Sequence, residues 1–162
     1  MQKFKIIALI TLFLLFSHML LFAEPVNLDI SIRFYDKKIY YLDSKIQILV
    51  EIYNPTSKES SFRLADNRVF SINFKAKTLS NKTLSPSQTY LLRKNSNQPV
   101  LYRDIVLAPG ERFSFIENIA DFIAIEEPGT YVVEADFSPD LLYHGGGTVI
   151  PSNILTLSVR PS

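Results

Sequence analysis

The chain has 162 residues, of which 47% are hydrophobic, and a formal net charge of +1. This near-neutral balance produces no field that would attract nucleic acid, so DNA or RNA binding is not expected. The absence of cysteine excludes disulfides, zinc–thiolate sites, iron–sulfur clusters and cysteine nucleophiles.

The first segment has the layout of a secretory signal. Lys3 and Lys5 precede two apolar runs within Ile6–Phe22, and the small Ala23 then precedes the polar Glu24. A basic start, an apolar middle and a small residue at the exit are typical of a cleaved signal. We therefore predict a signal helix over residues 1–23, cleavage between Ala23 and Glu24, and export to the periplasm, the cell envelope or the medium.

An uncleaved anchor is the alternative for this segment. The stretch from Ile6 to Ala23 is just long enough to cross a bilayer core, which takes roughly 17–25 residues. The protein would then contact the membrane only through this segment. With cleavage, one domain of residues 24–162 remains, and the loss of Lys3 and Lys5 leaves 15 basic and 16 acidic residues, a net charge of −1.

Along the rest of the chain the dominant period is two. Successive side chains of a strand point to opposite faces, so alternation predicts strands with one buried and one exposed face. Parallel sheets covered by helices would show continuous apolar runs instead. The alternating segments are Leu28–Phe34, Lys45–Ile52, Phe70–Phe74, Tyr131–Phe137 and Leu155–Val159.

Turn residues separate these strands. Asn54-Pro55 ends the second strand, and Asp66-Asn67 follows a short apolar piece, Phe62–Leu64. Pro109-Gly110 and Pro128-Gly129 each precede a strand, and Pro followed by Gly favours a type II turn. The spacing predicts an all-β fold, an antiparallel β-sandwich of seven or eight strands.

Two segments interrupt the alternation. Lys75–Pro99 is long, polar and mildly basic, with an apolar island at Tyr90-Leu91-Leu92. We expect the island to tuck onto the sandwich as an extra edge strand, and an exposed contact patch is the alternative. The second segment, Ser138–Ser152, contains three successive glycines, and a short helical turn is expected around Ile119 to Ala124.

The search for catalytic chemistry centres on His144, the one histidine that would remain after cleavage. Asp136 and Asp140 precede it, but no G-x-S-x-G elbow supplies a nucleophile, and Gly145–Gly147 lacks the phosphate-loop spacing. The acidic residues Asp136, Asp140 and Glu126-Glu127 lack EF-hand spacing, which leaves calcium as a minor alternative. We predict no catalytic residue, no metal site and no cofactor.

Several short motifs resemble a known family. Leu107-Ala108-Pro109-Gly110-Glu111 leads into one strand, Glu127–Ala135 into another, Ser152–Val159 closes the chain, and Asn54-Pro55-Thr56 follows an early strand. Together they resemble immunoglobulin-like modules of bacterial exported proteins and are similar to the BsuPI type of proteinase-inhibitor domain. The resemblance implies a sandwich fold, and no inhibitory reactive residue maps onto this chain. Tyr131, at a strand entrance, resembles the tyrosine corner of such sandwiches.

The prediction for function is an exported, non-catalytic binding module. Its partner is expected to be a protein, because sandwiches present loops and edge strands more readily than deep pockets. The alternatives are a BsuPI-like proteinase inhibitor and, second, a hydrolase or metal-dependent enzyme centred on His144. The residues predicted to bind the partner are Tyr90, Leu91, Leu92, Arg93, Tyr143 and His144.

Overall fold

The computed structural model describes residues 27–36, 39–141 and 147–162. The predicted signal, including Ala23 and Glu24, and the predicted partner-binding residues Tyr143 and His144 lie outside the described residues. Within them the predicted all-β, antiparallel, immunoglobulin-like sandwich is confirmed, with ten strands where seven or eight were expected. Two of the ten, β2 and β9, have three and two residues, too few for an alternating pattern to reveal them.

The strands and helices follow in this order along the chain: β1 (Asp29–Phe34), β2 (Ile39–Tyr41), β3 (Gln47–Tyr53), β4 (Ser60–Ala65), η1 (Arg68–Phe70), β5 (Ile72–Thr78), α2 (Gln88–Lys94), β6 (Tyr102–Leu107), β7 (Arg112–Asn118), η2 (Ile119–Asp121), β8 (Gly129–Phe137), β9 (Ile150–Pro151) and β10 (Leu155–Arg160). The elements η1 and η2 are single turns of 3₁₀-helix.

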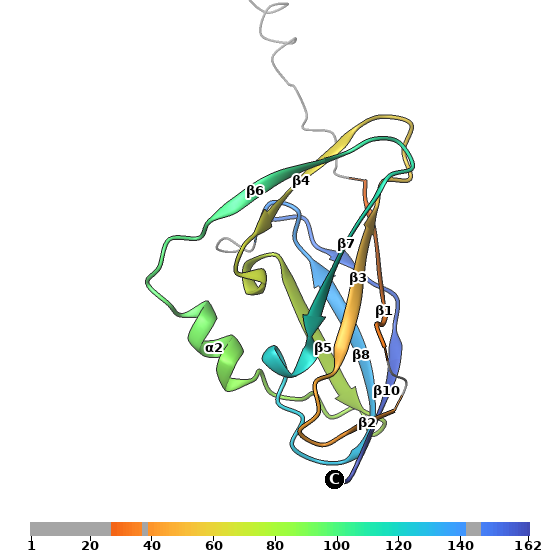
Figure 1. Cartoon of the computed structure of the whole chain (residues 1–162), viewed down its shortest axis with the longest axis vertical. Coiled ribbons are helices and arrows are strands. Elements are labelled where there is room, and N and C mark those ends of the chain that lie inside the picture. The colour runs from red at the N-terminus through yellow and green to blue at the C-terminus, as the bar shows by residue number, and fades with distance from the viewer. Residues whose placement is uncertain (1–26, 37–38, 142–146) are drawn as a thin grey trace, which may run out of the picture.

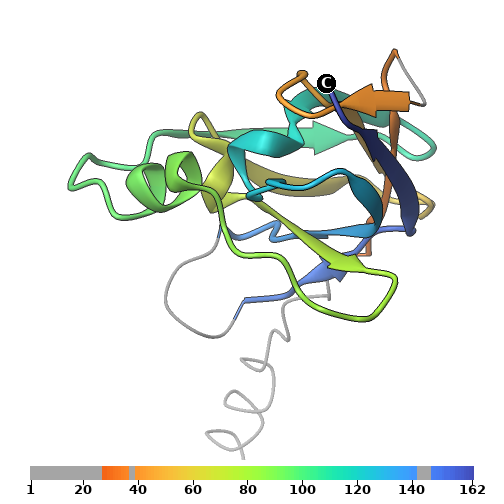
Figure 2. The ribbon, with the colours of Figure 1, turned by 90° about the horizontal axis from the view of Figure 1, so that it is seen from below.

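The strands form two packed sheets and a separate ribbon. One sheet has the order β1-β3-β7, and the other has the order β2-β10-β8-β5 with β9 added beside β8. The ribbon is the antiparallel pair β4-β6. Figures 1 and 2 show β7 and β3 in one layer, β5 and β8 in the other, and the ribbon to one side. All pairings are antiparallel except the short one between β2 and β10.

The core lies between the two sheets and is filled by alternate side chains. Ile48, Val50 and Ile52 of β3 face Val133 and Phe137 of β8 across it, and all five are buried. The ribbon closes one side of this core through Phe62 of β4. The Phe62 ring lies 6.0 Å from the ring of Phe113 in β7 and 5.4 Å from that of Phe137 in β8.

The segment Lys75–Pro99 differs from the prediction, because its apolar island forms a helix and not an edge strand. The hydroxyl of Ser87 accepts a 3.0 Å hydrogen bond from the Tyr90 N–H and so caps the first turn of α2. The Tyr90 ring packs against Phe122 at 6.2 Å, whereas Leu92 stays 65% exposed. Gln, Leu, Arg and Lys favour helix and make up five of the seven residues of α2, and with the Ser87 cap they outweigh the short apolar pattern.

Two local predictions also need correction. Phe70 belongs to η1, and the strand predicted from it begins only at Ile72. Gly110 has a φ of 75°, as a type II turn requires, whereas Gly129 has no such angle and begins β8. The helical turn expected around Ile119 to Ala124 is confirmed as the shorter η2.

Candidate functional site

The helix α2 is fixed to the body by three of its side chains. Besides the Tyr90 ring contact, Arg93 lies 3.2 Å from the Asp121 carboxylate in η2, and the Lys94 ammonium lies 4.7 Å from the centre of the Phe70 ring. The Ser87 hydroxyl at its start donates a 2.6 Å hydrogen bond to the Asp121 carbonyl. The predicted partner-binding residues Leu91 and Leu92 therefore sit on a positioned helix and face away from the core.

A polar pocket lies beside the helix, where η1, α2 and the end of β7 meet. Arg68 and Glu117 lie 3.6 Å apart, and both side chains are mostly buried. Burial raises the pKa of Glu117 to about 7, although the charges of Arg68 and Arg93 oppose this shift. Arg68 also lies over the Phe115 ring, at 5.3 Å. The pocket is lined by Asp66, Asn67, Arg68, Arg93, Gln98 and Glu117.

The charges in this pocket hold elements together and do not form a reactive group. Arg68 bridges η1 to β7 through Glu117, and Arg93 bridges α2 to η2 through Asp121. Positive and negative side chains are matched in pairs, so the pocket offers no single-sign field for a charged small molecule. These contacts fix α2 against η1 and η2.

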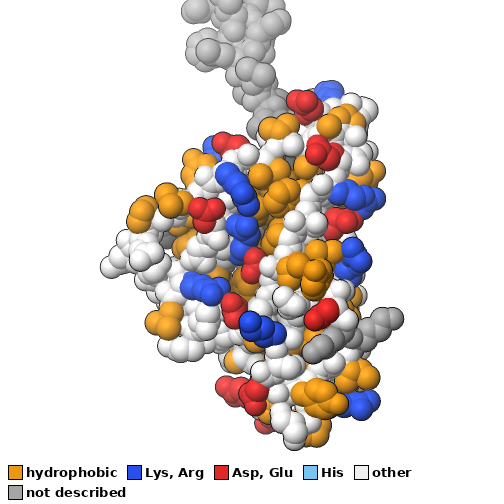
Figure 3. Space-filling model, in the orientation of Figure 1, with side chains coloured by type: hydrophobic (Ala, Val, Ile, Leu, Met, Phe, Trp, Pro, Cys, Tyr) orange, Lys and Arg blue, Asp and Glu red, His pale blue; other side chains and the backbone are white. Residues whose placement is uncertain are grey.

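Both α2 and β6 carry exposed apolar side chains. Among the described residues, twelve large hydrophobic side chains are exposed, and five of them belong to α2, to β6 or to the residue before β6. Figure 3 shows hydrophobic side chains between β6 and β7, with Lys and Arg side chains along their border. We call these five residues the α2–β6 set: Leu91, Leu92, Leu101, Tyr102 and Val106.

The β6 members of this set were missed by the sequence reasoning. On the outer face of the ribbon, Tyr102 and Val106 are 47% and 56% exposed. Between them Asp104 pairs with Arg63 of β4 at 3.5 Å, and the Arg63 guanidinium lies 5.3 Å from the Tyr102 ring centre. The composition of β6 could have revealed them. Apolar residues occupy both faces of this strand, although it lies at an edge and has only one face against the core.

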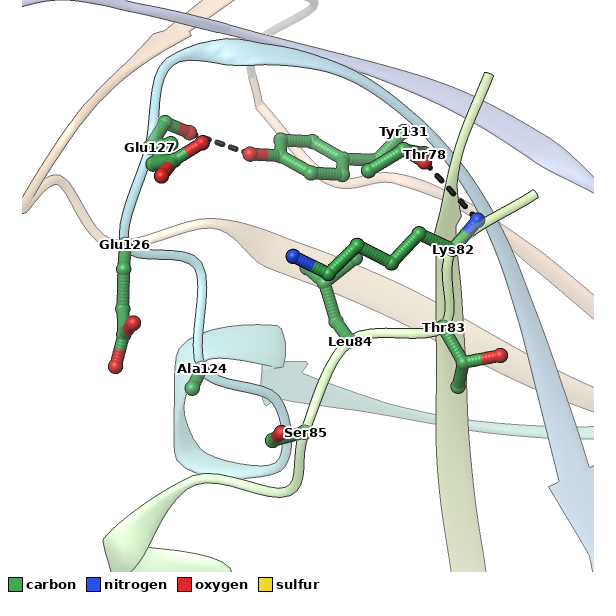
Figure 4. Close-up of a pocket in the computed structure, with 9 residues that line it drawn as sticks. All are labelled: Thr78, Lys82, Thr83, Leu84, Ser85, Ala124, Glu126, Glu127 and Tyr131. Carbon is green, nitrogen blue, oxygen red and sulfur yellow. Dashed lines mark hydrogen bonds between the residues drawn. The ribbon is translucent and has the colours of Figure 1, made fainter. Parts of the chain in front are cut away.

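A second pocket lies at the start of β8, and Figure 4 shows its residues. The Tyr131 hydroxyl donates a 2.5 Å hydrogen bond to the Glu127 carbonyl, which confirms the predicted tyrosine corner. Burial, with the nearby Glu127 charge, raises the pKa of Tyr131, so the hydroxyl stays protonated and acts as a donor. Lys82 extends across the pocket, but no described side chain there forms a nucleophile–base pair.

Two kinds of feature in the described residues would bear on metal binding or membrane insertion, namely clusters of metal-binding side chains and membrane-spanning helices. Three or more His, Asp or Glu side chains do not converge anywhere in this part of the chain. Asp136, a calcium candidate in the sequence, forms an ion pair with Lys75. None of the helices within the described ranges is long and apolar enough to cross a membrane.

A family model matches residues 29–160, and it is the model of the N-terminal domain of flagellar collar protein C. The chain belongs to this family. The match begins at the first residue of β1 and ends at the last residue of β10, so the family domain is the sandwich itself. No curated protein matches the chain.

Solved structures resemble this member of the collar protein C family only in fold. The CARDB domain of a Pyrococcus furiosus protein, in complex with di-metal ions, is 11% identical with a TM-score of 0.42, over 84% of this chain and 94% of that one. A β-glucosidase from Listeria innocua is also 11% identical, with a TM-score of 0.44 over 83% of this chain. The match spans only 16% of the glucosidase, and its activity is not transferred to this protein.

Proposed function

We propose that this protein is an exported, non-catalytic module that binds other proteins of a flagellar collar in the cell envelope. The family match over residues 29–160 is the observation that carries this proposal, because it covers every described strand. A collar is an assembly, and a domain within one acts through its surfaces. The predicted signal over residues 1–23 supports export.

The α2–β6 set supports binding of a protein partner. Large apolar side chains left exposed on a folded domain are candidates for an interaction site. Leu92, Tyr102 and Val106 are each exposed by nearly half or more, and the ion pairs beneath α2 hold the helix in place. Tyr90 and Arg93, predicted as contact residues, serve as anchors of this surface, and Tyr143 and His144 stay predictions.

The described residues give no specific support to the inhibitor alternative. An exposed, rigid loop projecting from the sandwich would favour that alternative, and a fully packed Lys75–Pro99 segment would count against it. The segment contains the end of β5 and a helix whose Tyr90 ring packs on Phe122, while Leu91 and Leu92 stay exposed. A packed helix is not a projecting inhibitory loop, so we keep the collar module as the conclusion.

Electron tomography of flagellar motors in the cells that make this protein tests the proposal. Deletion of its gene should remove or reduce the collar density, and the parent gene should restore it. A chain with Leu92→Glu and Tyr102→Glu should be exported in normal amount but fail to restore the collar, because two carboxylates would be buried at the contact.

Leu79→Glu is the matched control, because Leu79 is exposed and lies outside the α2–β6 set. This variant should restore the collar as the parent does. An unchanged collar in cells without the gene would contradict the proposed function. Full restoration by the Leu92→Glu, Tyr102→Glu chain would contradict the α2–β6 set as its binding surface.

A further inference from the structure

The strand β6 has only one paired edge. It forms six consecutive residue pairs with β4, from Ser60↔Leu107 to Ala65↔Tyr102, without a bulge. Its other edge meets no strand of the described part, and β7, which follows β6 along the chain, pairs only with β3. Figure 1 shows β6 and β7 diverging from the turn that joins them. One row of β6 backbone N–H and C=O groups is therefore open to a further strand.

Two other edge strands, β5 and β2, carry protections that β6 lacks. On the edge strand β5, Lys75 and Lys77 both lie outside the core, and the edge strand β2 has only three residues. Short strands and lysines are common protections against edge-to-edge pairing. The sequence of β6 contains no Pro, Gly or Lys, and four of its six residues are exposed. A two-stranded ribbon is also marginal by itself, and a third strand would stabilise it.

The inner face of β6 carries an uncompensated positive charge. Arg103 is exposed, and none of the ion pairs among the described residues includes it. It also acts on its neighbour: the pKa of Arg68 is lowered chiefly by burial, and Arg103 lowers it further, against the opposite effect of Glu117. A carboxylate brought next to Arg103 would relieve this repulsion. Asp104, on the opposite face, already has Arg63 as its partner.

We propose that an extended segment of a partner protein adds to the free edge of β6 as a third strand of the ribbon, with a carboxylate opposite Arg103. The segment's apolar side chains would cover Tyr102 and Val106. In antiparallel register the partner sequence reads apolar, apolar, any residue, acidic, apolar, placed opposite Val106, Ile105, Asp104, Arg103 and Tyr102. This inference rests on the protein-binding function proposed above and names how the partner is recognised.

A second copy of this chain fits the edge less well. Directly opposite side chains share one face of a sheet, so two β6 strands related by two-fold symmetry pair odd-numbered residues with odd-numbered ones. Arg103 would then face an apolar residue or another arginine, and never Asp104. Its charge would stay uncompensated, which favours a segment of different sequence.

A short peptide tests this inference on the ¹⁵N-labelled full chain. The probe is acetyl-Thr-Val-Ile-Thr-Glu-Val-Thr-amide, which carries the expected pattern. We expect saturable changes in the NMR shifts of the β6 amides. A copy of the peptide with N-methylated amides on its central Thr and second Val, opposite Asp104 and Tyr102, should lose binding. The Leu101 carbonyl is bonded to Asp66 of the β4 side, so the backbone groups of Tyr102, Asp104 and Val106 are the ones that face the free edge. No response of the β6 amides, or equal binding of the methylated copy, would overturn the proposal.

Charge reversal supplies the second readout. Arg103→Glu should weaken binding of the Glu peptide by about tenfold and should improve binding of a copy with Lys in place of Glu. Arg33→Glu on β1 is the control, because Arg33 is also an exposed strand arginine, and it should change neither affinity. Equal affinities for both peptides in Arg103→Glu would argue against the acidic contact.

The outcomes separate this inference from the proposed function. If the peptide leaves the NMR shifts of the β6 amides unchanged while tomography shows that the collar needs the protein, strand addition is overturned and the binding function stands. Concentration-dependent shifts of the β6 amides without peptide would identify a second copy as the occupant and would also overturn the proposal.

Discussion

The side-chain amide of Asn54 donates a 2.9 Å hydrogen bond to the backbone carbonyl of Leu107, the last residue of β6. The same amide nitrogen lies 2.7 Å from the Lys58 carbonyl and 3.2 Å from the Ala108 carbonyl, and its oxygen accepts from the Thr56 N–H at 3.0 Å. Asn54 is completely buried. One side chain thus ties the β3–β4 connection to the point where β6 and β7 separate.

Replacement of Asn54 by alanine should lower the free energy of unfolding by about 2–3 kcal/mol, because buried carbonyls would lose their donor. The midpoint of urea unfolding measures the loss. Asn97→Ala is the control, since Asn97 is exposed, and its midpoint should match that of the parent. Equal midpoints for the two variants would mean that the Asn54 bonds contribute no net stability.

Replacement of Tyr131 by phenylalanine removes the hydroxyl that bonds to Glu127 and leaves the ring in place. We expect a loss of about 1 kcal/mol, the usual net contribution of one such bond. Urea unfolding again measures the loss. Tyr102→Phe is the control, because the Tyr102 ring is half-exposed and its hydroxyl forms no hydrogen bond to another described residue. A Tyr131→Phe protein as stable as the Tyr102→Phe protein would argue against a stabilising tyrosine corner.

The fold was predictable from sequence where one physical rule acted alone. Alternation located β1, β3, β8 and β10, because each buries a single face against the core. It also led to an incorrect strand start at Phe70, where the apolar side chain belongs to a 3₁₀ turn that covers the core edge. An alternating pattern shows which side chains are buried, but it does not show whether a strand or a helical turn carries them.

The candidate site was less predictable, because its properties depend on pairing across the chain. The exposed helix residues Leu91 and Leu92 were found as an apolar island in a polar segment, though with the wrong secondary structure. The exposure of Tyr102 and Val106 depends on β6 pairing with β4 and not with β7, and no local pattern encodes that choice. Tyr143 and His144 lie outside the described residues.

The pKa of Glu117 sets a pH dependence of stability. Burial raises it from 4.5 to about 7, so the folded state binds a proton more tightly than the unfolded state. The stability that this tighter proton binding adds to the folded state is fully present below pH 4.5, and it is lost as the pH rises to about 7. In Glu117→Gln the stability should fall less than in the parent between these values. The midpoints of urea unfolding of both proteins, measured across this pH range, give the difference. The contributions of other titrating groups cancel in it. Parallel pH profiles of the two proteins would contradict the raised pKa.

The two sides of α2 should respond differently to mutation. Phe122 is buried and its ring lies 5.0 Å from Phe74 and 6.2 Å from Tyr90. Phe122→Ala should cost about 3–5 kcal/mol, because it opens a cavity beneath the helix. Leu92→Ala should change stability by less than about 0.5 kcal/mol. Thermal unfolding distinguishes them, and a large loss for Leu92→Ala would mean that this side chain packs within the domain.

Cleavage of the predicted signal has a direct chemical readout. N-terminal sequencing of the protein from the cell envelope should begin at Glu24, because Ala23 has the small side chain that signal peptidase requires. Ala23→Trp should block the cut and leave a longer, membrane-attached chain. A sequence that starts at Met1 in the parent would favour the uncleaved anchor.

The place of β10 in its sheet constrains when the domain can fold. This strand, Leu155–Arg160, lies between β2 and β8, so β2 has no neighbour in the sheet until residues 155–160 have been synthesised. A nascent chain that still lacks them leaves β2 and the first half of β8, Gly129–Val133, without their β10 neighbour, and Leu157 and Val159 are missing from the core. A sheet that is completed by its last strand is compatible with the predicted export, because translocation through a narrow channel requires an unfolded chain.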